Sequence, residues 1–348
     1  MAYFSRTVEI FRAMWYNYYV YANEGKRGGK AVKICVIFTG GTIGSRTNGS
    51  VVELGTAPYA LLEGLDMRGL EIVTAEPYTT LSEELDAEKL FLLAECVRDS
   101  LSHCDGIIIT HGTDTLVYTA AFLGLMFGDC GKGIALVSSG YPLDDPRANG
   151  KQNLEAAAAF LRAGHKGVAV PWYREGKTAI TPALRLMRQL PYDDVPIDLG
   201  GEALVYAGGA LHGVWEYEPK PCPFGGLEEH NRERFGRVMY LKALPVMYYP
   251  EPTEDISAVL IESYHSGTLC ADESFAEFMH KADALGIPVF IAGAGGREAD
   301  YETTAKYKAL GAVPLSKASP DVRYMELCLA VSYGVGGGLL KEFMIRTL

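Results

Sequence analysis

Apolar and polar residues alternate in blocks along most of the chain. Short runs rich in β-branched residues, such as residues 32–38 and 106–110, are each followed within two residues by glycine. Runs of this length and composition predict buried strands. Longer stretches with apolar residues at helical spacing lie between them, for example residues 86–100 and 151–163, and these predict helices. Strands that alternate with helices predict an α/β fold with a mostly parallel sheet.

The predicted elements form two groups. In the first, strands are expected at 32–38, 71–75, 106–110, 133–138, 167–172 and 203–207, and helices at 57–64, 86–100, 115–127 and 151–163. In the second, strands are expected at 237–243, 257–261, 288–292 and 312–315, and helices at 271–285, 301–309 and 320–333. Between them, residues 213–232 are rich in proline, glycine and acids, which is typical of an interdomain linker. We therefore expect a larger N-terminal parallel-sheet domain (31–212) and a smaller C-terminal α/β domain (233–348).

Residues 1–30 differ from the rest of the chain and form an N-terminal appendage. Val8, Phe11, Trp15, Tyr18 and Tyr19 fall at helical spacing on one face. A glycine- and lysine-rich stretch then predicts a flexible linker. Two interpretations remain open. In the first, the appendage has no separate function and is an extra helix packed on the body or an over-extended start. In the second, it is a helix that docks a partner.

Composition limits the classes of function. A chain of 348 residues, 48% of them hydrophobic, can form two domains with real cores. A net charge of −11 argues against a nucleic-acid-binding surface, because phosphate contacts need clustered Lys and Arg. No apolar run approaches the length of about 18 residues that a membrane span requires, and no signal peptide is evident. Seven scattered cysteines without CxxC spacing predict reduced thiols in a cytoplasmic protein and no metal site.

Two predicted strands end in threonine-rich sequences. The first strand is followed by Thr-Gly-Gly-Thr-Ile-Gly at 39–44, and the third by His-Gly-Thr-Asp-Thr at 111–115. Glycines let the backbone turn sharply and approach a ligand closely. In an open α/β sheet, ligands bind at the carboxyl ends of strands, so these two tips are the candidate site. Thr115 or Asp114 is also placed to cap the helix that follows.

Structural and functional interpretations of the tips compete. Taken alone, residues 39–44 fit a tight turn and residues 111–115 fit a capped helix start. Two such tips in one chain, each directly after a strand, favour a binding site. Neither GxxxxGK[ST] nor GxGxxG occurs at the first tip, which excludes a phosphate-binding loop of either kind.

The two tip sequences, in this order and about seventy residues apart, resemble the two signatures of the L-asparaginase/glutaminase amidohydrolases. The resemblance covers roughly residues 31–345 and implies a large domain, a linker and a smaller α/β domain. It also implies a type I, cytosolic-like enzyme that needs no metal or organic cofactor and assembles as a homodimer or homotetramer. Its substrate would be the side-chain amide of asparagine or glutamine, which differ by one methylene.

The resemblance also implies roles for individual residues. Thr42 would be the nucleophile that forms an acyl-enzyme and releases ammonia, and Thr113 the second catalytic threonine. A threonine hydroxyl is a weak nucleophile at neutral pH, so it needs a base or a strong local field. Asp114 would bind the substrate's ammonium group through a charge-assisted hydrogen bond. Gly41 and Gly112 would bring the backbone close to the ligand.

Supporting positions follow the family pattern in part. Ser82 lies where the family contacts the substrate's α-carboxylate, and Glu83 stands where glutamine or a small polar residue is more usual. Ser82 ahead of acids also fits a helix cap, so both interpretations stay open. Ser138 or Ser139 is expected to offer a carbonyl or hydroxyl near the site, and Asn153 to brace the loop.

Two departures from the family pattern bear on activity. The family has a tyrosine in a mobile loop after the nucleophile, whereas residues 45–51 contain none, and Tyr59 falls in a predicted helix. Placement without gaps puts Leu184 or Arg185 near the family's catalytic lysine, and only Lys177 in this stretch is a lysine. Arg185 would keep the positive charge but cannot act as a base, because its pKa stays far above neutral.

Three functions are therefore weighed. The leading one is a cytoplasmic threonine-nucleophile amidohydrolase that hydrolyses L-asparagine. The second is a binding or regulatory protein that kept the pocket and lost turnover, as the two departures suggest. The third is the amidase subunit of a tRNA-dependent amidotransferase. It is ranked last because it calls for a large N-terminal extension and a basic RNA-binding face.

Overall fold

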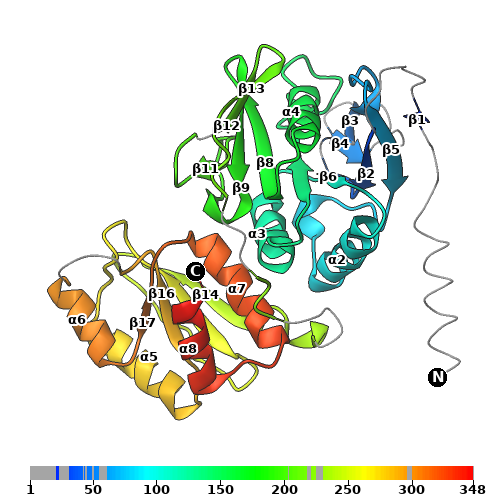
Figure 1. Cartoon of the computed structure of the whole chain (residues 1–348). Helices are drawn as coiled ribbons and strands as arrows, with labels where there is room; N and C mark the ends of the chain where they lie inside the picture. The colour runs from blue at the N-terminus through cyan, green and yellow to red at the C-terminus, as the bar shows by residue number, and fades with distance from the viewer. Residues whose placement is uncertain are drawn as a thin grey trace, which may run out of the picture. The chain divides into compact units, whose positions relative to one another are not determined.

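The computed structural model describes most of the chain in two compact units. The described residues are 21–22, 31–41, 43, 45–48, 51–54, 61–202, 204–217, 221–224, 230–295 and 300–347. The units are Met1–Cys222 and Pro223–Leu348, and their elements are labelled in Figure 1. The division falls inside the proline-rich segment 213–232. The expected appendage lies outside the described residues except for Tyr21–Ala22.

A large sheet forms the centre of the first unit. Within the described residues its strand order is β1-β5-β2-β6-β7-β8-β9-β12-β13. The bounds are β1 (Tyr21–Ala22), β2 (Val32–Phe38), β5 (Leu70–Ala75), β6 (Gly106–Thr110), β7 (Gly133–Val137), β8 (Gly167–Arg174), β9 (Lys177–Pro182), β12 (Leu204–Ala207) and β13 (Ala210–Gly213). The five strands from β5 to β8 pair in parallel. The carboxyl ends of the neighbouring strands β2 and β6 therefore meet at one edge of the sheet.

The central strands are buried on both faces, which explains their continuous apolar sequences. Cys35 and Val36, which point to opposite faces of β2, are both 0% exposed. Val36 belongs to a core cluster with residues of helix α4 (Gly150–Arg162). Helices α2 (Ala87–Leu101) and α3 (Leu116–Phe127) contact each other through an edge-to-face pair of Phe91 and Phe122. The predicted α/β class is confirmed.

Antiparallel hairpins extend the parallel core, and most of them were not predicted. The turn between β8 and β9 has Glu175 at φ 53° and Gly176 at φ 86°, as a tight type I′ hairpin turn requires. Outside the large sheet, β3 (Ser45–Asn48) pairs with β4 (Val51–Leu54), and β10 (Leu186–Met187) pairs with β11 (Ile197–Asp198). Of the predicted helix 57–64, residues 57–60 lie outside the described residues, and residues 61–64 form a short 3₁₀ segment and a turn rather than an α-helix.

The second unit repeats the alternation on a smaller scale. Its parallel sheet has the order β14 (Val238–Lys242), β15 (Ala258–Glu262), β16 (Val289–Ala292) and β17 (Val313–Leu315). Its described helices are α5 (Glu273–Ala284), α6 (Glu302–Ala309), α7 (Pro320–Ser332) and α8 (Gly337–Arg346). The sequence pattern predicted all of these elements except α8. That helix buries only Leu340 and Met344, a stripe too narrow to give a clear helical pattern.

A buried arginine links the last two helices of the second unit. Arg323 and Glu326, both in α7, are 2% and 0% exposed, and their side chains are 2.7 Å apart. Arg323 also donates hydrogen bonds to the carbonyls of Met344 in α8 and Ser316 before α7. The ion pair therefore stabilises the buried guanidinium within α7, and the bond to the Met344 carbonyl holds α8 against α7.

Candidate active site

The tip of β2 turns through two glycines in the left-handed region. Gly40 has φ 96° and Gly41 has φ 79°, values that a residue with a Cβ rarely adopts. Thr80 holds this turn, because it donates to the Thr39 carbonyl and accepts from the Gly41 N–H, both at 3.1 Å. The Thr39 hydroxyl donates to the Thr110 carbonyl at 2.6 Å. The first tip is thereby fixed to the end of β6.

The tips of β2 and β6 touch through their glycines. A Cβ built on Gly41 would lie 2.2 Å from the Gly112 nitrogen, and one built on Gly112 would lie 2.5 Å from the Ser82 hydroxyl. Contacts this short leave no room for a side chain at either position. Glycine at both positions therefore allows the two predicted tips to converge, and Thr113 and Asp114 follow directly.

Ser82 joins the tips from a third segment, the short 3₁₀ helix η3 (Ser82–Glu84). Its hydroxyl donates to Asp114 Oδ2 at 3.2 Å and accepts from the Asp114 N–H at 3.3 Å. Its carbonyl accepts from the Thr115 hydroxyl at 2.8 Å. Ser82 is buried, whereas Asp114 and the neighbouring Glu83 are exposed. Ser82 thus orients the Asp114 carboxylate at the surface of the site.

Of two helix caps that the sequence suggested, one is wrong and the other is correct in position only. Asp86, and not Ser82, caps α2, because its carboxylate accepts from the Lys89 N–H at 2.8 Å. Thr115 stands at the N-cap of α3, but it makes no side-chain cap hydrogen bond, because its hydroxyl is engaged by the Ser82 carbonyl. Both hydroxyls that fit caps in the sequence serve to connect η3 with the second tip.

His111 lies beneath the second tip and is 2% exposed. Its Nδ1 is 2.8 Å from the Gly112 carbonyl oxygen, and its Nε2 is 2.9 Å from the Thr119 hydroxyl on α3. Burial lowers the pKa of the imidazole to about 4, because the charged form loses its hydration. The ring is therefore neutral at physiological pH.

Thr42, the predicted nucleophile, lies outside the described residues. Its neighbours Gly41 and Ile43 are both buried, and Gly41 contacts the second tip. Of the eight predicted site residues, the structure brings together Gly41, Ser82, Gly112, Thr113 and Asp114, with Glu83 exposed beside them.

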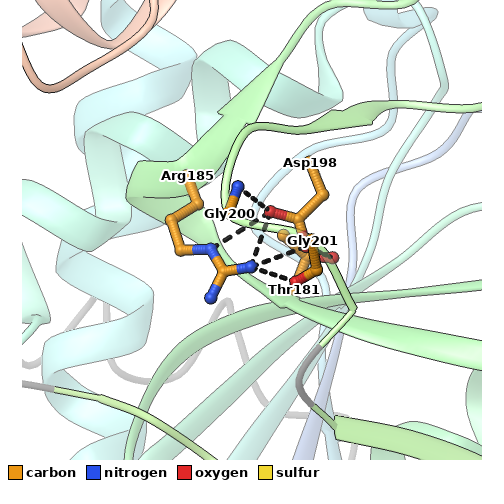
Figure 2. A network of polar contacts seen from close by, with 5 residues as sticks. All are labelled: Thr181, Arg185, Asp198, Gly200 and Gly201. Carbon is orange, nitrogen blue, oxygen red and sulfur yellow. Dashed lines mark hydrogen bonds and ion pairs between the residues drawn. The ribbon is translucent and has the colours of Figure 1, made fainter.

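Arg185 is engaged in a separate polar cluster (Figure 2). Its guanidinium donates to both carboxylate oxygens of Asp198, at 2.8 and 2.9 Å, and also to the Gly201 carbonyl. Asp198 accepts as well from the Thr181 hydroxyl at 3.3 Å and from the Gly200 N–H at 2.9 Å. None of these contacts reaches a tip residue, so the predicted catalytic role of Arg185 gains no support from its surroundings.

Gln189 is a residue near the site that the sequence did not single out. Its side-chain nitrogen donates to the Thr113 carbonyl at 3.4 Å. The same segment reaches the tip of β7, because a Cβ built on Gly140 would lie 3.4 Å from the Asp194 carboxylate. The segment 188–196 therefore passes from the second tip to the end of the next strand. In the sequence, the only signal for Gln189 was that it follows the stretch around Arg185, where the family's catalytic lysine was expected.

The tip of β7 is braced as the sequence suggested. Asn153 donates to the Ser138 carbonyl at 2.9 Å and accepts from the Tyr173 N–H at 2.6 Å, so it links the ends of β7 and β8. The Ser139 hydroxyl donates a hydrogen bond to the Tyr141 carbonyl. The Ser138 hydroxyl is buried and has no partner in the described part of the chain.

The site leaves several polar groups available. Among the described residues, neither the Thr113 hydroxyl nor the Thr113 N–H has a hydrogen-bond partner, and Asp114 Oδ1 has none. A hydroxyl, a backbone donor and a carboxylate beside two close glycines can bind a small zwitterion and act on its polar group. Within the described ranges no cluster of His, Cys, Asp and Glu has a geometry that could hold a metal ion. None of the described helices is long and apolar enough to span a membrane.

Comparison with known sequences identifies similar proteins. Residues 33–182 match the family model described as Asparaginase, N-terminal. An L-asparaginase from Thermococcus kodakarensis is 29% identical over 184 residues, 50% of this chain and 56% of the relative. A subunit of the glutamyl-tRNA(Gln) amidotransferase from Thermoplasma volcanium is 32% identical over 142 residues, 39% of this chain and 35% of the relative. The corresponding amidotransferase chain from Methanopyrus kandleri is 28% identical over 86% of this chain and 70% of its own length. The chain thus spans 56% and 35% of the first two relatives.

A solved structure agrees in fold. The thermostable L-asparaginase from Thermococcus kodakarensis superposes with a TM-score of 0.72 at 20% identity, over 90% of this chain and 97% of that one. At this identity the likeness concerns the fold alone.

Proposed function

The chain belongs to the asparaginase family, and from this premise we propose that it hydrolyses the side-chain amide of a small amino acid. L-asparagine is the leading substrate, and the products are L-aspartate and ammonia. The substrate's polar ends would bind at the two strand tips, where Asp114 takes the ammonium group. The observation that supports this proposal is the convergence of Gly41, Ser82 and Gly112 around Thr113 and Asp114.

The proposed reaction has two steps. The Thr42 hydroxyl attacks the amide carbon, the carbon–nitrogen bond breaks, and ammonia leaves with the hydroxyl proton. Water then attacks the resulting ester, which releases the acid and restores the Thr42 hydroxyl. Thr113 would assist proton transfer through its hydroxyl, which has no partner among the described residues. We assign no step to Arg185, since its guanidinium is bound to Asp198 and Gly201.

Ammonia release from L-asparagine and L-glutamine tests the proposal. We expect wild type to release ammonia, and Thr42→Ala and Thr113→Val to lose about 10³-fold or more in kcat. Thr347→Val is the matched control, because this threonine makes only a local hydrogen bond to Phe343 in α8. Saturable binding of L-aspartate without any ammonia release would favour the non-catalytic regulatory protein instead.

A second candidate function comes from the relatives named as part of a glutamyl-tRNA(Gln) amidotransferase. On this proposal the same site releases ammonia from L-glutamine for a partner protein that acts on charged tRNA. It predicts that kcat/KM for L-glutamine exceeds that for L-asparagine, and that turnover rises when glutamyl-tRNA and the partner are added. The net charge of −11 implies that RNA contacts would come from that partner.

Assembly and location are proposed on the same basis. We place the protein in the cytoplasm as a homodimer or homotetramer, because its cysteines are free thiols and because the family implies the assembly. Light scattering of the purified chain measures its mass in solution. A monomer that is fully active would contradict the assembly.

A further inference from the structure

His111 occupies a closed position between the second tip and α3. It is 2% exposed, so it does not contact substrate directly. Its two ring nitrogens nevertheless each meet one polar atom, the Gly112 carbonyl oxygen at 2.8 Å and the Thr119 hydroxyl at 2.9 Å. A packing role alone would not require both contacts.

The identity of the two partners fixes the protonation of the ring. A carbonyl oxygen only accepts hydrogen bonds, so Nδ1 must carry the proton and donate to Gly112. Because burial keeps the ring neutral, Nε2 then has no proton and must accept from the Thr119 hydroxyl. The Gly112 carbonyl thereby selects one of the two neutral tautomers of His111, and the Thr119 hydroxyl donates to the nitrogen left without a proton.

The bond to Gly112 sets the direction of the peptide that leads into Thr113. In a trans peptide the C=O and the N–H point in opposite directions, and the described residues contain no cis peptide. The Gly112 carbonyl points into the interior at His111, so the Thr113 N–H points away from the interior. That N–H has no partner in the described part of the chain, and it lies beside the equally available Thr113 hydroxyl.

We propose that His111 is a positioning residue: its protonated Nδ1 binds the Gly112 carbonyl, the Thr119 hydroxyl supports its Nε2, and the ring so held fixes the Gly112–Thr113 peptide so that Thr113 faces the substrate. The role depends on the proposed amidohydrolase function, because it acts through Thr113. A Cβ built on Gly41 would lie 2.4 Å from the Gly112 Cα, the first atom of this peptide, so a movement of the peptide would also disturb the first tip.

A pair of substitutions separates the two nitrogens. In His111→Asn the amide nitrogen takes the place of Nδ1 and can still donate to Gly112, whereas in His111→Gln the amide reaches the place of Nε2 and leaves Gly112 without a donor. Both remove the ring, so their losses of thermal stability should be similar. We expect kcat to fall about 100-fold in His111→Gln, as for a misplaced catalytic group, and about 10-fold or less in His111→Asn. Equal losses of kcat in the two variants would overturn the proposal.

Thr119 supplies a second test with its own rescue. Thr119→Val removes the donor to Nε2 and should lower kcat, while Thr119→Ser keeps the hydroxyl and should restore it. Nitrogen-15 spectra of histidine-labelled protein distinguish a protonated from an unprotonated ring nitrogen, and the signal missing in His111→Asn identifies His111. In wild type we expect the His111 signals to show a protonated Nδ1 and an unprotonated Nε2. An Nε2–H pattern would refute the proposal.

The tests keep this inference apart from the proposed function. Absence of ammonia release by wild type with any amide would defeat the amidohydrolase. The tautomer and the calorimetric affinity for L-aspartate need no turnover, so they still report on His111. Wild-type affinity for L-aspartate in His111→Gln would show that the Gly112–Thr113 peptide does not depend on His111.

Discussion

Two polar clusters of the first unit differ in how their groups are used. The tip cluster comprises Gly41, Ser82 and residues 112–114, and the arginine cluster comprises Arg185, Asp198 and their three neighbours (Figure 2). In the arginine cluster both Asp198 oxygens accept hydrogen bonds, and the guanidinium has two acceptor residues. In the tip cluster the Thr113 hydroxyl, the Thr113 N–H and one Asp114 oxygen have no partner among the described residues.

The difference indicates which cluster is built for a ligand. A polar network that satisfies its own members stabilises the fold and offers nothing to a substrate. A cluster that brings unpaired groups together at the end of a parallel sheet holds them ready for an incoming molecule. Sequence placement assigned catalysis to both clusters, whereas the contacts favour only the tips. The comparison can be tested from either side.

The largest expected effect comes from the contact between the tips. Gly41→Ala puts a Cβ 2.2 Å from the Gly112 nitrogen, whereas Gly131, which also has a positive φ, has open space around its Cβ. Both alanines lose about 1–2 kcal/mol of stability through the left-handed backbone, but only Gly41→Ala separates the tips. We expect it to lower kcat/KM by about 100-fold or more, with Gly131→Ala near wild type. Equal activities of the two variants would contradict the assignment of the site.

The next effect concerns the charge of Asp114. Asp114→Asn keeps the shape but removes the negative charge that would bind the substrate's ammonium group. A charged hydrogen bond contributes about 1.5–3 kcal/mol, so we expect KM to rise about 10- to 100-fold with little change in Tm. Asp129→Asn at the far end of α3 is the control, since that side chain is also exposed. Initial-rate kinetics of both variants give the comparison, and an unchanged KM in Asp114→Asn would refute ammonium binding by Asp114.

The third effect concerns how stability depends on pH, which differs between the neutral His111 ring and the surface carboxylates. The pKa of the ring is about 4 in the folded chain, against an ordinary value of 6.5. Between pH 6.5 and pH 4 the ring is therefore protonated in the unfolded chain but not in the folded chain. Stability from the neutral ring is therefore complete above pH 6.5 and is lost as the pH falls towards 4. At about 1.4 kcal/mol per pKa unit the loss is about 3 kcal/mol.

Denaturant unfolding at pH 7 and pH 4 measures this loss. We expect the stability of wild type to fall by about 3 kcal/mol more than that of His111→Asn. Carboxylates with lowered pKa values, such as Asp145 at about 2, lose their contributions only at lower pH. The same pH dependence in wild type and His111→Asn would mean that folding leaves the pKa of the His111 ring at its ordinary value.

The smallest effect is expected in the arginine cluster and falls on stability alone. Arg185→Gln leaves Asp198, whose side chain is 15% exposed, without its cation, at a loss of about 2 kcal/mol. Lys177→Gln removes a half-exposed ion pair with Glu202 and should lose less than about 1 kcal/mol. Ammonia release should change less than about 3-fold in both variants. Loss of turnover in Arg185→Gln at unchanged Tm would restore the predicted catalytic role of Arg185.

The sequence predicted the parts of the site that depend on local pattern. The strand before Thr39 and the strand before His111 were both recognised from β-branched runs that end in glycine, and parallel pairing then required their ends to meet. Ser82 was found through its place in the family pattern. Its contact with Asp114 is consistent with that pattern.

The parts that depend on tertiary contacts were not predicted. Arg185 was placed by counting residues, and the count could not show that β11 brings Asp198 beside it. Gln189 reaches Thr113 only because the segment 188–196 passes the ends of β6 and β7, which no periodicity reveals. The β8–β9 turn was missed because Glu-Gly is a weaker hairpin signal than Asn-Gly or Asp-Gly.

The contact between Gly41 and Gly112 also limits how the proposed site can be redesigned. Since backbone meets backbone there, the point where the tips meet has no side chain to exchange, and any library that randomises these two positions would contain mostly inactive clones. Substrate range must then be altered from the neighbouring segments, the one around Ser82 and Glu83 and the segment 188–196. An engineer who wants a different amide accepted should spread diversity over those two loops and leave both glycines unchanged.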